Sequence, residues 1–312
     1  AWVIHGVLVD VFIASLEAPP EEVVLDFDAT DDPVHGRQEG RFFHGYYDHY
    51  CFLPLYVFCG ERLLVSYLRT SNRGDARHSW AILALLVRFI REYWPQTRIV
   101  FRGDSHFSKP RLLAWCDRNQ VDYIVGMARN QRLEALAAPA MDKVRTYYEA
   151  HGHKLASTFR FRYKARSWHK PRWVVARLEY GPQGPNPRFV ISSRYDDGFK
   201  LYYEQYCARG DMENRIKDQQ LDLFAGRTSS THWWTNQWRL ILSGFAYTLF
   251  ERLRVHLKNT PFERMSAGTL RLKLIKVGAV IIRNTRRIRV LMSDSYPHKN
   301  DLSALVQRLV PQ

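Results

Sequence analysis

The stretch Glu21-Glu-Val-Val-Leu-Asp-Phe-Asp28-Ala-Thr30 is a short apolar run that ends in acidic residues. Pro20 precedes the run and Pro33 follows it, and an apolar run bounded in this way predicts a β-strand. Residues two apart in a strand project from the same face, so Asp26 and Asp28 share one face. The pattern predicts a strand that brings a carboxylate to its C-terminal end.

A second strand with the same design is Arg98-Ile-Val-Phe-Arg-Gly-Asp104, which also runs into an acid. A helix is predicted from Ser108, with Ser108 as N-cap and Pro110 in the first turn. Ligands of open α/β sheets bind at the carboxyl ends of the strands, so both strand-end acids are candidate site residues. For either acid alone, a turn or capping aspartate is the favoured interpretation.

The third candidate acid lies in Tyr206-Cys-Ala-Arg209-Gly-Asp-Met-Glu213-Asn-Arg-Ile-Lys217. A carboxylate flanked by cations and a phenol suits a phosphodiester, because the acid can hold a divalent metal while the cations meet the phosphate charge. A solvated helix face of mixed charge explains this segment equally well on its own. A helical step of about 100° per residue places four side chains on one stripe: Tyr206, Arg209, Glu213 and Lys217.

The composition is strongly basic. Among 312 residues, Lys and Arg exceed Asp and Glu by 15, which favours a polyanionic partner, nucleic acid before membrane. Four cysteines without C-x2-C spacing indicate neither a zinc site nor a disulfide framework, which fits a reducing cytoplasm. The apolar run from Trp2 to Leu16 contains Asp10 and lacks a basic segment before it, so an amphipathic helix packed on the body is expected.

The order of elements predicts the fold class. Two β-rich runs, Phe52 to Cys59 and Arg62 to Arg69, read as a hairpin, and Ser79 to Trp94 has helical periodicity with Ser79 as a possible cap. A strand is expected from Asp122 to Ala128. The order strand, hairpin, helix, strand, helix, strand predicts an α/β protein with a ribonuclease-H-like mixed sheet flanked by helices.

Two segments depart from that order. Within residues 131–199, two stretches alternate apolar and basic residues, Thr158-Phe-Arg-Phe-Arg-Tyr-Lys164 and Arg172-Trp-Val-Val-Ala-Arg177. The turn Gly181-Pro-Gln-Gly-Pro-Asn-Pro187 is incompatible with a helix, so a β-rich insertion is expected there. A long helix is expected from Thr231 to Leu257. The segment Leu270 to Met292 predicts a β-ribbon whose one basic face follows phosphates, or equally an edge hairpin with solvated cations; its cations include Arg271, Lys273, Arg287 and Arg289.

The sequence resembles the DDE transposases of bacterial insertion sequences, in the branch described as transposase DDE domain group 1. The resemblance runs from about Val23 to about Pro297. Related transposases place a lysine seven residues after the glutamate, where this chain has Gln220; Lys217, one turn earlier, is a candidate substitute. The matching pieces are Leu25-Asp-Phe-Asp28-Ala-Thr30-Asp-Asp-Pro-Val-His-Gly36, Phe101-Arg-Gly-Asp104-Ser-His-Phe107, Tyr206 with Arg209 and Glu213, Gly226-Arg-Thr228, Asn236-Gln-Trp-Arg239-Leu, and Thr269-Leu-Arg-Leu-Lys-Leu-Ile-Lys-Val-Gly-Ala279.

The resemblance implies DNA transposition by phosphoryl transfer, with Asp28, Asp104 and Glu213 holding two Mg²⁺ or Mn²⁺ ions. Asp26 is the rival for the first acid, and Asp28 is preferred because the Asp-x-Thr pattern of similar transposases starts there. The implied partner is double-stranded DNA, at transposon ends and target, bound by a homodimer in the bacterial cytoplasm and at the nucleoid, without membrane association. The implied DNA contacts are Tyr206, Arg209, Lys217, Arg227 and Arg239.

The resemblance also divides the chain. Residues 1–22 are expected to form an N-terminal helix, the remnant of a preceding DNA-binding region that full-length relatives would carry, since the sequence begins with Ala. Residues 23–129 form the first part of the catalytic core, 130–200 the insertion, 201–260 the final core helices and 261–312 a basic C-terminal segment. An indole of the insertion, Trp168 or Trp173, is a candidate for stacking on a base. The alternative functions are a nuclease of the same fold and a non-catalytic DNA-binding protein.

Overall fold

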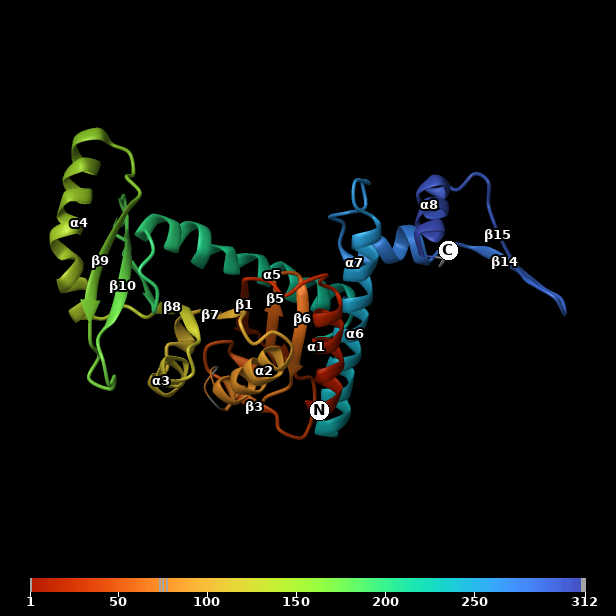
Figure 1. The fold of residues 1–312 in the computed structure, drawn as a ribbon, viewed down its shortest axis with the longest axis horizontal. Helices are drawn as coiled ribbons and strands as arrows, with labels where there is room; N and C mark the ends of the chain where they lie inside the picture. Colours follow the sequence, from red (N-terminus) through yellow and green to blue (C-terminus); the bar gives the residue numbers. More distant parts are fainter. Residues whose placement is uncertain (1, 73, 75, 77, 310–312) are drawn as a thin grey trace.

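An eight-stranded mixed sheet with helices on both faces forms the body of the protein (Figure 1). The computed structural model describes residues 2–72, 74, 76 and 78–309. Three neighbouring strands, β1, β7 and β8, are parallel, and β5 and β6 continue the sheet antiparallel beyond β1. The predicted ribonuclease-H-like mixed sheet is thereby confirmed. These five strands are β6 (Arg62–Tyr67), β5 (Leu55–Cys59), β1 (Glu22–Ala29), β7 (Arg98–Gly103) and β8 (Asp122–Met127), in spatial order.

One face of the sheet is covered by the helices α1 (Trp2–Ala14), α2 (Ser79–Tyr93) and α3 (Pro110–Arg118). Alternate residues of β1, among them Leu25 and Phe27, are fully buried against these helices. The intervening residues of β1 therefore face the opposite side of the sheet, and the acids of this strand are among them.

The opposite face is covered by a continuous helical run and by a long helix. Met212 and Ile216 of this run pack with Leu240 of the long helix over β5 and β6. The long helix, α6 (Trp233–His256), was predicted from Thr231 to Leu257. The helical run changes type along its length: η2 (Lys200–Tyr206) is π-helical, η3 (Cys207–Arg209) is 3-10, α5 (Gly210–Lys217) is α-helical and η4 (Asp218–Asp222) is π-helical.

The insertion extends the core sheet. Its strand β13 (Arg188–Ser192) pairs antiparallel with β8, and β10 (Arg172–Leu178) and β9 (Ser157–Tyr163) follow at the edge. A short ribbon of β11 (Tyr180–Gly181) and β12 (Gly184–Pro185) lies between β10 and β13 in the sequence.

The insertion also begins with a helix that the alternation pattern did not predict, α4 (Gln131–His151). Asn130 caps it by accepting a hydrogen bond from the Leu133 amide, and Gly152 ends it in the left-handed conformation. Its buried residues Leu133 and Val144 pack on alternate residues of β10. The insertion is therefore mixed, with a helix lying over its strands.

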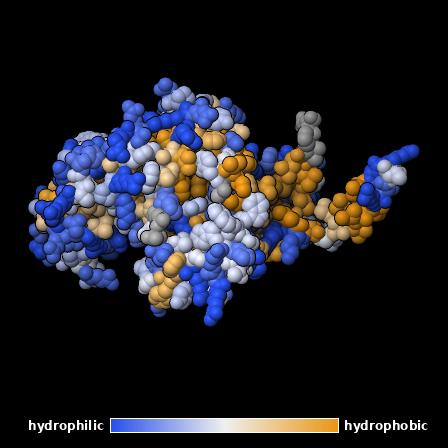
Figure 2. Space-filling view, turned by 90° about the horizontal axis from the view of Figure 1, so that it is seen from below, coloured by the Kyte–Doolittle hydropathy of each residue, from blue (hydrophilic) through white to orange (hydrophobic). Residues whose placement is uncertain are grey.

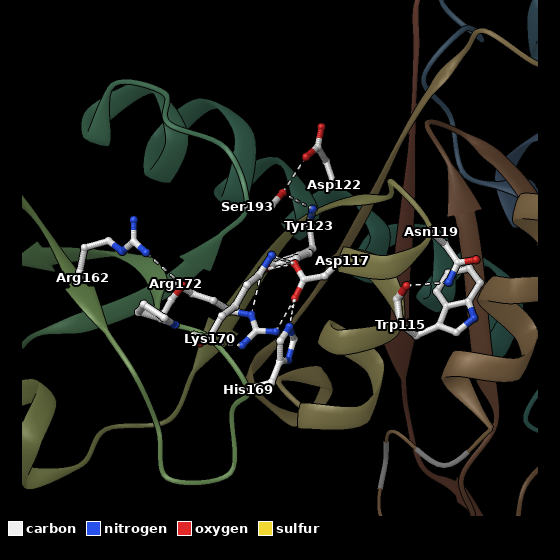
Figure 3. A network of polar contacts seen from close by, with 11 residues as sticks. Trp115, Asp117, Asn119, Asp122, Tyr123, Arg162, His169, Lys170, Arg172 and Ser193 are labelled. Carbon is white, nitrogen blue, oxygen red and sulfur yellow. Dashed lines mark hydrogen bonds and ion pairs between the residues drawn. The ribbon is translucent and has the colours of Figure 1, made fainter.

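An ionic cluster fastens the insertion to the core (Figure 3). Asp117 of α3 accepts a hydrogen bond from Arg172 at 2.6 Å, and its other oxygen lies 2.9 Å from the Lys170 ammonium. The Arg172 guanidinium, whose side chain is 1% exposed, also donates to the Tyr123 hydroxyl at 2.9 Å. Trp168 lies under the same guanidinium at 4.9 Å and is 5% exposed. The stacking role predicted for Trp168 is therefore wrong, because its indole belongs to the core.

Two predicted helix starts shift. The Ser108 hydroxyl donates to the Ser105 carbonyl and closes the short helix η1 (Ser105–Phe107), so α3 begins at Pro110 with Lys109 in the cap position. Ser79 is the first residue of α2 rather than its cap, because its hydroxyl donates back to the Ala76 carbonyl. In both cases the serine hydroxyl donates a hydrogen bond to a carbonyl of the preceding turn and so does not cap the helix that follows.

The N-terminal helix α1 packs on the body, but it is not amphipathic. Its inner residues His5 and Phe12 are buried, and the His5 ring is hydrogen-bonded to the Ser66 carbonyl at 3.0 Å. Its outer face is apolar as well, with Val3 and Val7 exposed. Within the part of the chain that the structure describes, no helix is long and apolar enough to cross a membrane.

The C-terminal segment differs most from its prediction. Residues 267–275 are helical, as α7 (Ala267–Leu270) and η5 (Arg271–Ile275), because Leu270 and Leu274 are buried together at helical spacing. The ribbon begins only at β14 (Ala279–Arg283), which pairs with β15 (Ile288–Met292).

The predicted basic face of this ribbon is absent. Arg283 stands opposite Ile288, and Arg289 stands opposite Ile282, so the two strand arginines lie on opposite faces. All ten strand residues are exposed, and Figure 2 shows hydrophobic residues gathered on this arm, which projects from the body. The remaining elements are α8 (Lys299–Leu309) and a small sheet of β2 (Asp32–Pro33), β4 (His49–Phe52) and β3 (Phe42–His44).

Candidate active site

Two acids leave adjacent parallel strands at the same edge of the sheet. Phe27 of β1 pairs in register with Gly103 of β7, so Asp28 and Asp104 follow as neighbours. Asp28 is on the face that the helical run covers, and Asp104 begins the turn that η1 continues. The sequence pattern placed both acids correctly, at the carboxyl ends where open sheets bind ligands.

Asp104 is held in place by its own turn. One carboxylate oxygen accepts a hydrogen bond from the His106 amide at 2.9 Å, and the other lies 2.9 Å from Nδ1 of the His106 ring. A quarter of its side chain remains exposed. The carboxylate is therefore oriented and still accessible.

Asp28 is the most perturbed acid of the site. Burial raises its pKa from 3.8 to about 6; Arg209 opposes the rise, and the charges of Asp104 and Glu213 add to it. One oxygen accepts from the Ala29 amide at 2.9 Å and the other from Arg209 Nη1 at 3.1 Å. Because the other two acids both act on Asp28, the three carboxylates form one electrostatic cluster.

Glu213 enters the cluster from the opposite side, on α5. Its carboxylate lies 3.9 Å from Arg209 Nη2, and 56% of its side chain is exposed. The Arg209 guanidinium thus stands between Asp28 and Glu213. The predicted four-residue stripe is only partly present, because the helix changes from π to 3-10 to α type between Tyr206 and Glu213. Lys217 ends α5 as an exposed residue.

The Tyr206 hydroxyl lies close to the strand ends because position 126 is a glycine. A β-carbon on Gly126 of β8 would lie 2.5 Å from the Tyr206 hydroxyl and 2.9 Å from the Ser105 amide nitrogen, so only glycine leaves room for this approach. Burial raises the pKa of Tyr206, and Arg209 lowers it. Tyr206 is therefore a neutral, hydrogen-bonding group beside Arg209 and the strand ends.

Asp26, the alternative candidate for the first acid, is already paired with an arginine. It is 1% exposed and accepts two hydrogen bonds from Arg102, at 2.5 and 2.7 Å. Arg102 also donates to the Gln205 carbonyl of the covering helix. This buried pair joins the sheet to the helix and leaves Asp26 no free oxygen for a ligand, which supports Asp28 as the site residue.

The carboxylates are grouped but do not form an assembled metal shell. Among the residues that the structure describes, no set of three or more His, Cys, Asp or Glu side chains is arranged to hold a metal ion. The donors nonetheless fit Mg²⁺ or Mn²⁺, since all are carboxylate oxygens and the charges of Asp104 and Glu213 both act on Asp28. A bound cation would replace the guanidinium as the partner of Asp28.

Two predicted DNA contacts lie in a different hollow. Arg239 donates to the Ser229 hydroxyl at 2.7 Å, and Arg227 lies over the Phe224 ring at 4.4 Å; all four line one shallow surface depression. Gln220, which occupies the position of the expected lysine, donates to the Asp31 carbonyl at 2.9 Å. Gln220 therefore has a structural contact between the helical run and the segment after Asp28.

Sequence reasoning missed a buried acid and a group of arginines. Asp32 is 1% exposed and accepts from Thr228 at 2.5 Å, and burial raises its pKa to about 7. This contact joins β2 to the Gly226-Arg-Thr228 motif. Both residues lie in motifs shared with the family, and that co-occurrence could have indicated the contact.

The missed arginines line a hollow beside Ser105. Arg129 follows β8, Arg177 lies on β10 and Arg188 begins β13.

The family model for transposase DDE domain group 1 matches residues 2–312. The chain belongs to this family. No curated protein matches it. Among solved structures, this transposase-family chain is similar to a piggyBac transposase synaptic complex with hairpin DNA, at 12% identity and a TM-score of 0.44, over 75% of this chain and 47% of that one. It is also similar to Marinitoga piezophila Argonaute with guide RNA and target DNA, at 8% identity and a TM-score of 0.26, over 80% and 32%. The chain thus spans less than half of either structure.

Proposed function

We propose that this protein is a DDE transposase that cuts and joins DNA strands in a metal-dependent reaction and moves an insertion sequence. The observation that carries the proposal is the grouping of Asp28 and Asp104 at one sheet edge with Glu213 opposite them, in a chain of the DDE family. Paired carboxylates around one point are the arrangement that phosphoryl transfer with two metal ions requires.

Asp28, Asp104 and Glu213 would hold two Mg²⁺ or Mn²⁺ ions. When bound, these ions activate the attacking oxygen and stabilise the leaving oxygen of an in-line displacement. With a cation on Asp28, the planar guanidinium of Arg209, which pairs with Asp28 in this structure, would be available to a phosphate. Tyr206, held over Gly126, adds a neutral hydrogen-bond donor to the same phosphate.

The reaction consists of two displacements at phosphorus. In the first, a water oxygen attacks the scissile phosphate, the P–O3′ bond breaks, and the 3′ oxygen takes a proton and leaves as a free 3′-OH. In the second, that 3′ oxygen attacks a phosphodiester of the target, and the target's own 3′ oxygen leaves. The second step breaks one phosphodiester bond and forms another of the same kind. One site can therefore catalyse both displacements.

Double-stranded DNA, at the transposon ends and the target, is the proposed partner in the bacterial cytoplasm. The excess of 15 cations supplies attraction without sequence preference. Arg209 and Tyr206 act at the acids, whereas Arg227 and Arg239 act from their separate depression. Lys217, exposed at the end of α5, continues the contact along the helix.

A homodimer is the proposed assembly, and the β14–β15 arm is its proposed contact. Both faces of the arm are apolar and exposed, with Ile281 at 68% on one face and Val280 at 63% on the other. A two-stranded ribbon is marginally stable alone, and no other strand among the described residues pairs with either of its edges. A second copy offers the same apolar, unpaired surface, so two arms can pair symmetrically.

Cleavage of the element's own end duplex tests the proposal. Asp104→Asn keeps the shape of the side chain and removes the charge, so cleavage and strand transfer in Mg²⁺ should be lost while DNA binding remains. Asp211→Asn is the matched control, because Asp211 is an exposed acid on the same helix as Glu213 and lies outside the cluster.

The products distinguish the alternatives. A nuclease of this fold would cut the duplex without joining the freed 3′ end to a target. A non-catalytic DNA-binding protein would bind the end and produce no cut in any metal. Full cleavage by the Asp104→Asn protein would contradict the proposed site.

A further inference from the structure

A hollow of about 470 Å³ lies directly beside the candidate acids. Ser105, the residue after Asp104, forms one part of its wall, and Tyr206 forms another. Tyr206 is also the residue that reaches over Gly126 toward the strand ends. The hollow and the acid cluster therefore share a wall, and a chain of nucleotides lying across the acids would continue into the hollow.

The charge of this arginine hollow is entirely positive. Arg129 follows β8, Arg177 lies on β10 and Arg188 begins β13, and no acid lines the hollow with them. Arg177 forms an ion pair with Glu179, which does not line the hollow. Arg129 donates to Asn186 at 2.5 Å, and in the described chain no carboxylate forms an ion pair with Arg129 or Arg188. Two exposed guanidinium groups therefore lack an anionic partner.

The lining favours a phosphate over a base. Two of the three aromatic residues of the wall, Phe189 and Tyr202, are 3% and 9% exposed, so they present little ring surface for stacking. The third, Tyr206, directs its hydroxyl toward Gly126. The accessible groups are guanidinium forks, which match the oxygen geometry of a phosphate. A volume of this size accepts one nucleotide unit and excludes a duplex.

We propose that the arginine hollow binds the backbone phosphate of an unpaired nucleotide next to the scissile bond. The proposal rests on the function proposed above, because it assumes that a DNA strand passes over the acids. In this role Arg129 and Arg188 hold the flanking strand after the duplex ends, and Tyr206 separates the flanking phosphate from the reacting one. The hollow thereby assigns a function to the insertion, which supplies Arg177 and Arg188.

The test compares the binding of two DNA duplexes that differ only in a short single-stranded tail. The full chain is titrated in EDTA, so that catalysis does not contribute, and the gain in affinity from the tail is measured by fluorescence anisotropy. The double variant Arg129→Ala/Arg188→Ala should lose most of that gain, roughly tenfold in affinity. Its slope of log affinity against log salt should fall by about one for each arginine removed, on the tailed duplex only.

Arg132→Ala is the matched control, because Arg132 is an exposed arginine three residues from Arg129 and outside the hollow. It should leave the gain from the tail unchanged. Both substituted arginines are exposed, so the thermal unfolding of the double variant should match that of the parent protein.

Three results would overturn the inference: equal losses on blunt and tailed duplexes, a control that behaves like the double variant, or saturation of the hollow by inorganic phosphate with no preference for tailed DNA. The assay is independent of the proposed chemistry. A tail effect that survives without any cleavage activity would sustain the hollow while the transposase proposal failed, and cleavage without a tail effect would do the reverse.

Discussion

Arg209 influences the lowest pH at which the proposed reaction proceeds, which we call its acid limit, because it lowers the pKa of Asp28. Burial raises the pKa of Asp28 to about 6, with Arg209 opposing the rise. At this value roughly nine-tenths of the group is ionised at pH 7 and about one-tenth at pH 5. Because a metal ligand must be the carboxylate, cleavage should rise with pH through 6 and fall about tenfold per unit below it.

Arg209→Ala removes the opposing charge and leaves every cause that raises the pKa: burial, Asp104 and Glu213. The removed pair is close, 3.1 Å between Nη1 and Oδ2, and both side chains are less than a fifth exposed. A close arginine lowers an aspartate pKa by about 1–3 units, so the acid limit should move upward by about one unit or more.

The assay is a pH–rate profile of single-strand cleavage at limiting Mg²⁺, where the proton on Asp28 competes with metal binding, together with a carbon NMR titration of the metal-free protein in which Asp28→Asn assigns the resonance. Arg215→Ala is the control, since Arg215 is on the same helix and does not act on Asp28. An acid limit near pH 4, or one that Arg209→Ala leaves in place, would refute the reasoning.

Three further outcomes are expected. Asp117→Ala should lower the free energy of unfolding by about 3–5 kcal/mol in urea, because it leaves the buried Arg172 charge unpaired; a loss under 1 kcal/mol would contradict this. Asp32 has its pKa raised to about 7, above its unfolded value of 3.8, so its contribution to stability is complete below pH 3.8 and declines as pH rises toward 7; the Asp32→Asn protein should lack this decline in pH-dependent calorimetry. Ile281→Asp with Val290→Asp should shift a dimer to a monomer in light scattering without changing the melting temperature of the body, and a parent protein that is already monomeric would refute the arm contact.

The core strands and their acids were predictable because the two-residue alternation of a β-strand determines which side chains are buried and which face the site. In β1 the alternate residues Leu25 and Phe27 pack against helices, so the same alternation brings Asp28 to the other face. Local sequence is sufficient for such an inference. Asp104 was equally predictable, because a strand that ends in Gly-Asp places its acid at the sheet edge.

The contacts that define the site were not predictable from local sequence. Arg209 reaches Asp28 across 181 residues, and no short motif encodes that pair. The change from π to 3-10 to α geometry before Glu213 depends on how η2 packs over β8 and β10, so an ideal helical stripe was the wrong template. The same holds for Leu270 and Leu274, where burial against α8 selects a helix over the alternation that predicts a ribbon.

The arginine hollow was missed for a related reason. Arg177 and Arg188 lie on strands of the insertion, where a cation in an alternating pattern is usually solvated. Only the pairing of β13 with β8 carries them to the edge where Asp104 ends its strand. Tertiary strand order therefore determines this surface, and no single segment reveals it.

The central claim is that Asp28, Asp104 and Glu213 bind the catalytic metal ions together. Anomalous diffraction at the manganese edge, from crystals soaked in Mn²⁺ with and without Glu213→Gln, tests it most directly. The claim predicts two peaks about 3.5–4 Å apart between the three carboxylates, with Arg209 withdrawn from Asp28, and loss of at least one peak in the variant. Manganese bound elsewhere, or a site that omits Asp28 or Asp104, would contradict it.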